Sequence, residues 1–156
     1  MPRIRIKNFG PIKNGFIDES GFIDIKKVTV FIGDQGTGKS SIAKLISTLS
    51  WIEKALIRGD VKENEVVRKG SFENKFCGYQ NIKNYFDKTG GTEIEYEGTA
   101  YSFRYKNKTF EVSKKTENGF LVPKIMYVPA ERNFVSAVDK PSLLKRLPST
   151  LYTFLD

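Results

Sequence analysis

The chain has 156 residues, a formal net charge of +8, a single cysteine and no histidine. This length suits one globular domain with a core of its own. No apolar stretch approaches the ~20 residues that a membrane-spanning helix requires. Because histidine is absent, catalysis and metal binding by imidazole are excluded within these residues.

The cysteine content bears on the cellular compartment, and the net charge bears on the binding partners. Cys77 has no partner for an internal disulfide, which suits a reducing cytoplasm. We interpret it as a small, half-buried apolar residue. The positive charge favours polyanionic partners, nucleic acid among them. A solvated basic surface is the alternative that the charge leaves open.

The first part of the chain predicts three extended segments. Residues 3–9 alternate basic residues with isoleucine, the pattern of a half-buried strand, and Gly10-Pro11 ends it. Residues 15–25 form a second extended stretch with a turn near residues 19–21. The apolar, β-branched run Val28–Ile32 predicts a buried strand.

A glycine-rich loop follows this run and fits the pattern G-x-x-x-x-G-K-S/T. It reads Gly33-Asp34-Gln35-Gly36-Thr37-Gly38-Lys39-Ser40, with Ser41 next. Apolar residues then recur at helical spacing, which predicts an amphipathic helix to about Arg58, before Gly59. Strand, loop and helix in this order are the context in which the pattern indicates a phosphate-binding P-loop, or Walker A motif.

Each position in the loop has a chemical role. The three glycines allow backbone conformations that a Cβ would forbid, so that N–H groups point toward the phosphates of a nucleotide. Lys39 should reach the β- and γ-phosphates, and the Ser40 hydroxyl should bind Mg²⁺. The predicted ligands are therefore ATP and Mg²⁺. The alternative is a glycine-rich turn that only caps a helix.

The residue pattern, and with it the predicted secondary structure, changes twice between residues 60 and 115. Residues 60–70 are charged and weakly patterned, which predicts a loop, and residues 71–88 suggest one or two short helices. From 92 to 115 the apolar period becomes two, which predicts an antiparallel meander of three strands.

The outer faces of this meander carry complementary charges. Glu93, Glu95 and Glu97 would lie opposite Ser102, Arg104 and Lys106, and such pairs support the register. A competing hypothesis is nucleic-acid binding by the basic hairpin. Its members are Arg104, Lys106, Lys108, Lys114 and Lys115, interleaved with Tyr101, Tyr105 and Phe110.

The last third of the chain holds a second strand candidate and an apolar end. Residues 123–129 predict a buried strand, which Ala130-Glu131-Arg132-Asn133 follows. Residues 141–156 are rich in leucine, and so apolar a stretch favours packing on another lobe or self-association.

Three phrases resemble the N-terminal part of ABC-type ATPases of the SMC/RecF/OLD kind. The opening Ile4-Arg5-Ile6-Lys7-Asn8-Phe9 is similar to their first strand, and Gly33–Ser41 to their P-loop, with Gln35 where they have asparagine. Met126–Asn133 resembles the "Y-I/V-P-A-E-R" phrase of ABC-like, AAA-family bacterial ATPases. The resemblance implies an α/β fold, with a P-loop core sheet and an antiparallel β-subdomain beside it.

The same resemblance implies roles for individual residues and a longer complete protein. Glu131 takes a metal-facing, catalytic role beside Lys39, or else belongs to an ion-paired structural turn. The adenine base falls near Phe9, Lys13 and Phe16, although these aromatic residues suit a core equally well. The chain has no Walker B strand, signature segment or switch histidine, so residues 1–156 are expected to be the N-terminal lobe of a longer ATPase.

The lobe and the complete protein are expected to differ in activity and in oligomeric state. The lobe alone should bind nucleotide and turn it over negligibly, because it lacks the carboxylate that orders the attacking water. The complete protein should hydrolyse ATP and form an ATP-dependent dimer. Two alternatives stay open: a small-molecule or nucleoside kinase, against which the first-strand phrase argues, and a nucleic-acid-binding module with a vestigial P-loop, against which the intact Lys39-Ser40 pair argues.

Overall fold

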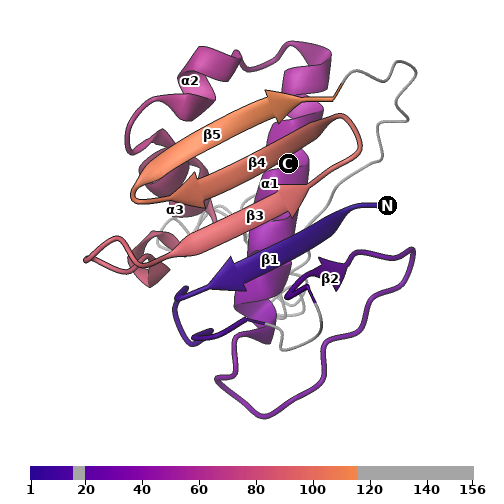
Figure 1. The fold of residues 1–156 in the computed structure, drawn as a ribbon, viewed down its shortest axis with the longest axis vertical. Coiled ribbons are helices and arrows are strands. Elements are labelled where there is room, and N and C mark those ends of the chain that lie inside the picture. Colours follow the sequence, from indigo (N-terminus) through magenta and orange to yellow (C-terminus); the bar gives the residue numbers. More distant parts are fainter. Residues whose placement is uncertain (16–19, 116–156) are drawn as a thin grey trace, which may run out of the picture.

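The computed structural model describes residues 1–15 and 20–115. These residues form a five-stranded sheet in the order β2-β1-β3-β4-β5, and every neighbouring pair is antiparallel (Figure 1). The strands are β1 (Arg3–Lys7), β2 (Ile23–Asp24), β3 (Glu93–Glu97), β4 (Tyr101–Lys106) and β5 (Thr109–Lys114). The fold is therefore mixed α and β around an antiparallel sheet. The parallel P-loop core sheet that the sequence predicts is not among the elements of the described residues.

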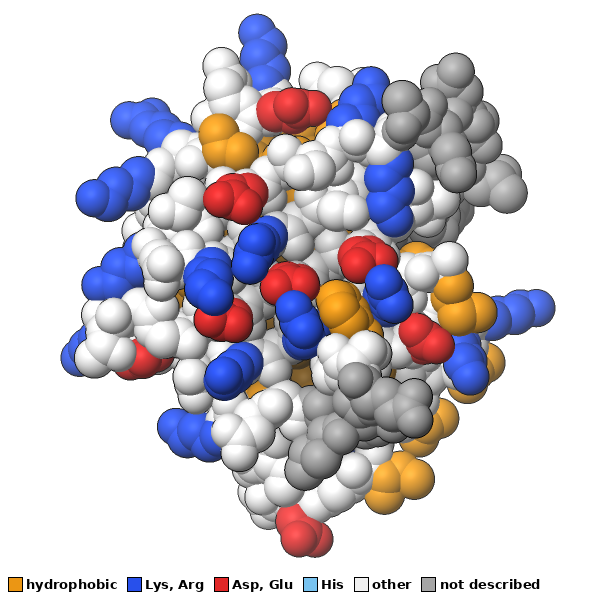
Figure 2. Space-filling model, viewed as in Figure 1, with side chains coloured by type: hydrophobic (Ala, Val, Ile, Leu, Met, Phe, Trp, Pro, Cys, Tyr) orange, Lys and Arg blue, Asp and Glu red, His pale blue; other side chains and the backbone are white. Residues whose placement is uncertain are grey.

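The predicted strand at Val28–Ile32 is wrong for the described part of the chain. The segment is assigned to no strand, and Val28, Val30 and Ile32 are 76%, 72% and 92% exposed. Hydrophobic side chains line the edge of the molecule where the loop between β2 and α1 runs (Figures 1 and 2). A β-branched apolar run becomes a buried strand only when neighbouring strands pair with it and cover it, and no described segment does so.

Helix α1 (Lys39–Arg58) lies across one face of the sheet, and its bounds agree with the apolar periodicity (Figure 1). Its buried stripe includes Leu45, Leu49 and Ile52, which pack on inward residues of the strands. Gly59, at φ +77°, donates its N–H to the carbonyls of the last turn and ends the helix. Within residues 1–15 and 20–115, no helix combines the length and apolar character needed to cross a membrane.

The segment between α1 and β3 folds into short helical pieces over an aromatic core. Residues 60–70 include a helix, so the predicted loop is corrected in part. The pieces are α2 (Glu63–Val67), the π-helical turn η1 (Phe72–Phe76), α3 (Cys77–Tyr79) and the 3₁₀ turn η2 (Lys83–Tyr85). Phe72 stacks on Phe110 with ring centroids 4.2 Å apart. Cys77 is fully buried, and burial raises the pKa of its thiol.

The outer face of the sheet pairs its charges across the strands. Guanidinium and carboxylate meet in Arg3–Glu97 at 2.8 Å and Arg5–Glu95 at 2.7 Å. The Lys106 ammonium lies 2.9 Å from a Glu93 oxygen, so opposite charges do face each other between β3 and β4. Figure 2 shows this face as interleaved basic and acidic side chains. The alternation in the sequence predicted the pairs between β3 and β4, and the structure adds the two pairs with β1.

The aromatic side chains of the basic hairpin lie on the buried face of the sheet, opposite its charged outer face. Tyr101, Tyr105 and Phe110 are all buried in the core, whereas Arg104 on the same strands is exposed. Stacking on nucleic-acid bases requires exposed rings. The interleaved pattern in the sequence therefore reflects the two faces of strands, and these rings do not provide a stacking surface.

A buried carboxylate fastens α1 to the β3–β4 turn. Glu53, on α1, is 7% exposed and accepts hydrogen bonds from the backbone N–H groups of Ala100 at 2.7 Å and Tyr101 at 3.1 Å. The Tyr96 hydroxyl donates a third bond at 3.2 Å. Burial, with a smaller contribution from the Glu53 charge, raises the pKa of Tyr96, so its hydroxyl stays a donor at neutral pH.

Candidate phosphate-binding site

The glycine-rich loop and the start of α1 form the candidate site. Gly36 and Gly38 have φ values of +82° and +99°, a region that favours glycine, so the loop bends as the sequence predicts. Thr37 stabilises the bend, because its hydroxyl donates to the Asp34 carbonyl at 2.8 Å. The residues from Gly33 to Thr37 are all solvent-exposed, and the loop is open to a ligand.

The start of α1 offers unpaired donors. Gly38 is the N-cap and provides no side chain, and the first turn holds no acidic residue. Among the described residues, no hydrogen bond uses the backbone N–H groups of Lys39, Ser40 and Ser41. These N–H groups point along the axis of a 20-residue helix, whose N-terminus carries partial positive charge. The arrangement suits an anion.

Lys39 is folded back over the loop. Its Nζ donates to the carbonyl oxygens of Gly33 at 2.7 Å and Asp34 at 2.5 Å. The same nitrogen lies 3.4 Å from the Thr37 hydroxyl oxygen. The ammonium group is therefore held against the backbone of the glycine-rich loop by these contacts.

The donor set also suits a hard cation. Ser40 is exposed, and no hydrogen bond within residues 1–15 and 20–115 occupies its hydroxyl. A hydroxyl oxygen beside bound phosphates is a ligand that Mg²⁺ accepts. No cluster of three or more acidic or cysteine residues that would bind a metal by itself occurs in the described part of the chain. Ser40 would therefore hold Mg²⁺ together with phosphate oxygens.

The turn after β1 packs against the glycine-rich loop at Gly38, and the sequence motif contained no signal for this contact. Phe9 and Ile12 exchange backbone hydrogen bonds at 2.9 and 3.0 Å, which closes the turn. A Cβ on Gly38 would lie 2.8 Å from Ile12 Cγ1 and 3.2 Å from Pro11 Cγ. The residues after the first strand thus set the position of the loop, although only the P-loop letters suggested a site.

The remaining predicted site residues divide into two groups. Phe9 is completely buried, so the structure agrees with the core interpretation and places no exposed ring there for adenine. Lys13 is exposed. Phe16, Glu131, Arg132, the strand candidate at 123–129 and the apolar stretch at 141–156 lie outside the described residues.

We expect Gly38→Ala to lower the free energy of unfolding by about 2–3 kcal/mol, because alanine at positive φ is strained and its methyl group meets Ile12. Gly36→Ala is the matched control, since its Cβ would meet no atom within 4 Å and only the backbone strain applies. Urea unfolding of both variants measures the difference. Adding Ile12→Ala should restore part of the stability of Gly38→Ala. Equal losses for the two glycines would contradict support by the turn.

Comparison of the chain with protein-family models, curated proteins and solved structures finds no match.

Proposed function

We propose that this chain binds ATP·Mg²⁺ through residues 33–41, as the first lobe of a cytoplasmic ABC-type ATPase. The observation that carries the proposal is the start of α1, where three successive backbone N–H groups have no partner among the described residues and Lys39 Nζ lies against the neighbouring loop. A triphosphate would supply hydrogen-bond acceptors for these N–H groups and negative charge for the positive end of the helix. Lys39 and Mg²⁺ would neutralise the β- and γ-phosphates, and the glycine loop would position them.

The exposed segment Val28–Ile32 supports the larger assignment. Its alternate residues Val28, Val30 and Ile32 present apolar side chains to solvent directly before the P-loop. Large apolar side chains at three alternate positions favour pairing with further strands. A P-loop core sheet built around this segment would provide that pairing, and hydrolysis would belong to the assembled protein.

The nucleic-acid module with a vestigial P-loop gains no support from the sheet. Its outer face pairs basic with acidic side chains, and the hairpin's aromatic rings are buried. The loop retains lysine and serine together with free N–H groups, which a decayed motif would have no reason to keep. ATP binding therefore remains the function that the geometry favours.

Lys39→Ala should weaken ATP·Mg²⁺ binding at least tenfold, which corresponds to about 1.4 kcal/mol. The substitution removes the cation nearest the phosphates while the glycines remain. Isothermal titration calorimetry measures both affinities, and a thermal shift with ATP·Mg²⁺ provides an independent readout.

Lys54→Ala is the matched control, because it removes the same charge from the same helix 15 residues further along, about 22 Å away. It should leave the affinity within a factor of about two. Equal affinities for the wild-type and Lys39→Ala chains would show that the nucleotide, if bound, lies elsewhere.

A further inference from the structure

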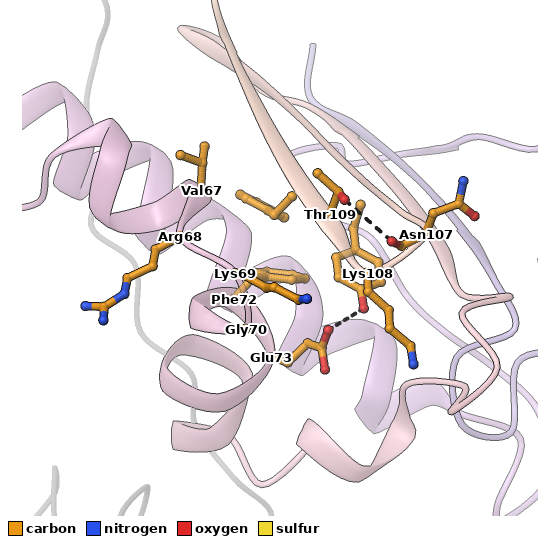
Figure 3. A pocket seen from close by; sticks show the side chains of 11 residues that line it. Val67, Arg68, Lys69, Gly70, Phe72, Glu73, Asn107, Lys108 and Thr109 are labelled. Atoms are coloured by element: carbon orange, nitrogen blue, oxygen red, sulfur yellow. Dashed lines mark hydrogen bonds between the residues drawn. The ribbon is translucent and has the colours of Figure 1, made fainter.

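A second pocket lies between the β4–β5 turn and the segment that joins α2 to η1. Its volume is about 350 Å³. Val67–Gly70, Phe72 and Glu73 form one wall, and Tyr105 and Asn107–Phe110 of the hairpin form the other (Figure 3). Figure 1 shows this turn at the opposite end of the strands from β2, away from the glycine loop. The pocket is therefore a separate site.

Two lysines at the pocket lack partners. Lys69 lies in the segment between α2 and η1, and Lys108 lies in the β4–β5 turn (Figure 3). Neither ammonium group makes an ion pair or hydrogen bond among the described residues. Lys106, two residues before Lys108, is paired with Glu93. Arg68 also lines the pocket, but its guanidinium points away from the hairpin. Lys69 and Lys108 thus bring two ammonium groups without partners among the described residues to one pocket.

The described lining of the pocket contains one acidic side chain, which is already hydrogen-bonded, so the basic residues in this lining outnumber the acidic ones. Among the described residues that line the pocket, Glu73 is the only one with a carboxylate, and it accepts a hydrogen bond from the Tyr105 hydroxyl at 2.5 Å. Burial and this carboxylate raise the pKa of Tyr105, so the hydroxyl remains a donor. Phe72, Tyr105 and Phe110 supply apolar surface at the floor.

The backbone at Lys108 is an independent observation. Asn107 and Lys108 have φ values of +50° and +60° and form the two-residue hairpin turn. Such a turn favours glycine at its second position, where a lysine is strained. Strained residues that persist beside a pocket point to a function of their side chain. Here the strain places a free ammonium group at the pocket.

We infer that this pocket binds a phosphate monoester of nucleotide size through Lys69 and Lys108. The two ammonium groups would bind the phosphate, for which lysine is a common ligand. The aromatic floor would contact the organic part of the ligand. The volume lies at the lower end of the ~300–1,000 Å³ that small-molecule sites span. A free mononucleotide and the terminal phosphate of an oligonucleotide share this chemistry.

The test measures binding of AMP to the Lys39→Ala chain, in which the P-loop is disabled, so the outcome does not depend on the proposed ATP site. Two-dimensional NMR titration should show shifts at residues 67–73 and 105–110. Adenosine, which lacks the phosphate, should bind at least tenfold more weakly. Lys69→Gln and Lys108→Gly should each weaken AMP binding at least fivefold.

Two controls separate binding from folding. Lys108→Gly gives the turn its preferred Asn-Gly pair, so its melting temperature should equal or exceed that of the parent chain while affinity falls. Lys106→Gln removes the same charge from the same hairpin outside the pocket and should change the affinity less than twofold. Glu73→Gln keeps an acceptor for Tyr105, removes a repulsive charge and should tighten binding.

A 5′-phosphorylated oligonucleotide distinguishes the two sources. Binding at least tenfold tighter than that of AMP would identify a nucleic-acid end as the ligand, and equal binding would identify a free nucleotide. The inference is overturned if millimolar AMP causes no shifts in the pocket. It is also overturned if Lys106→Gln weakens binding as much as Lys108→Gly does.

Discussion

Replacing Glu53 with alanine should lower the free energy of unfolding by about 3–5 kcal/mol, because two buried backbone donors lose their acceptor at once. The N–H groups of Ala100, in the β3–β4 turn, and of Tyr101, the first residue of β4, bond to the same Glu53 oxygen. The Tyr96 hydroxyl keeps its contact with Ser50, at 3.2 Å, so only part of its hydrogen bonding is lost. Urea denaturation followed by circular dichroism measures the change.

Glu65→Ala is the control for this substitution. Glu65 is an exposed carboxylate that pairs with Lys75, and removing it should change the unfolding midpoint little. Gly98 provides a second check, because a Cβ there would overlap the Glu53 carboxylate. Gly98→Ala should therefore destabilise the parent chain more than it destabilises Glu53→Ala. A loss below about 1 kcal/mol for Glu53→Ala would mean that water replaces the carboxylate without cost.

Phe9→Ala should cost about 3–5 kcal/mol of stability, the usual range for truncating a buried phenylalanine. Phe9 is completely buried, and its ring meets those of Tyr85 and Phe86 edge-on with centroids 5.7 and 5.1 Å apart. The same residue begins the turn that supports the glycine loop. Thermal and urea unfolding measure the loss.

Phe9→Leu separates this role from stacking on adenine. Leucine fills most of the buried volume, so the fold should survive with a smaller loss of stability. If the ring stacked on a base, the leucine variant would lose about 1–3 kcal/mol of binding, a factor of about 5–150 in affinity. The buried position predicts ATP affinity within a factor of two of the parent. A selective loss of ATP affinity in a stable Phe9→Leu chain would return Phe9 to the nucleotide site.

Local sequence patterns predicted the helix, strands and loop that depend on interactions between neighbouring residues. The apolar spacing after Lys39 and the glycine at position 59 predicted α1 to its last residue, since helix periodicity and a left-handed cap are properties of neighbouring residues. The alternation from 92 to 115 predicted three strands and the acid–base pairs between β3 and β4. The P-loop letters likewise predicted a bend that only glycine tolerates well.

The tertiary structure decided what depends on partners distant in the chain. Val28–Ile32 has the composition of a buried strand, yet a strand needs neighbours, and the described residues provide none. The aromatic residues of the basic hairpin resembled a stacking surface in the sequence, but the sheet buries them in the core, with Tyr105 and Phe110 against Phe72. Glu53 looked like any charged helical residue, because nothing local shows that backbone N–H groups 47 and 48 residues later would donate to it. Pairing and burial are set by long-range contacts, and a single sequence does not display them.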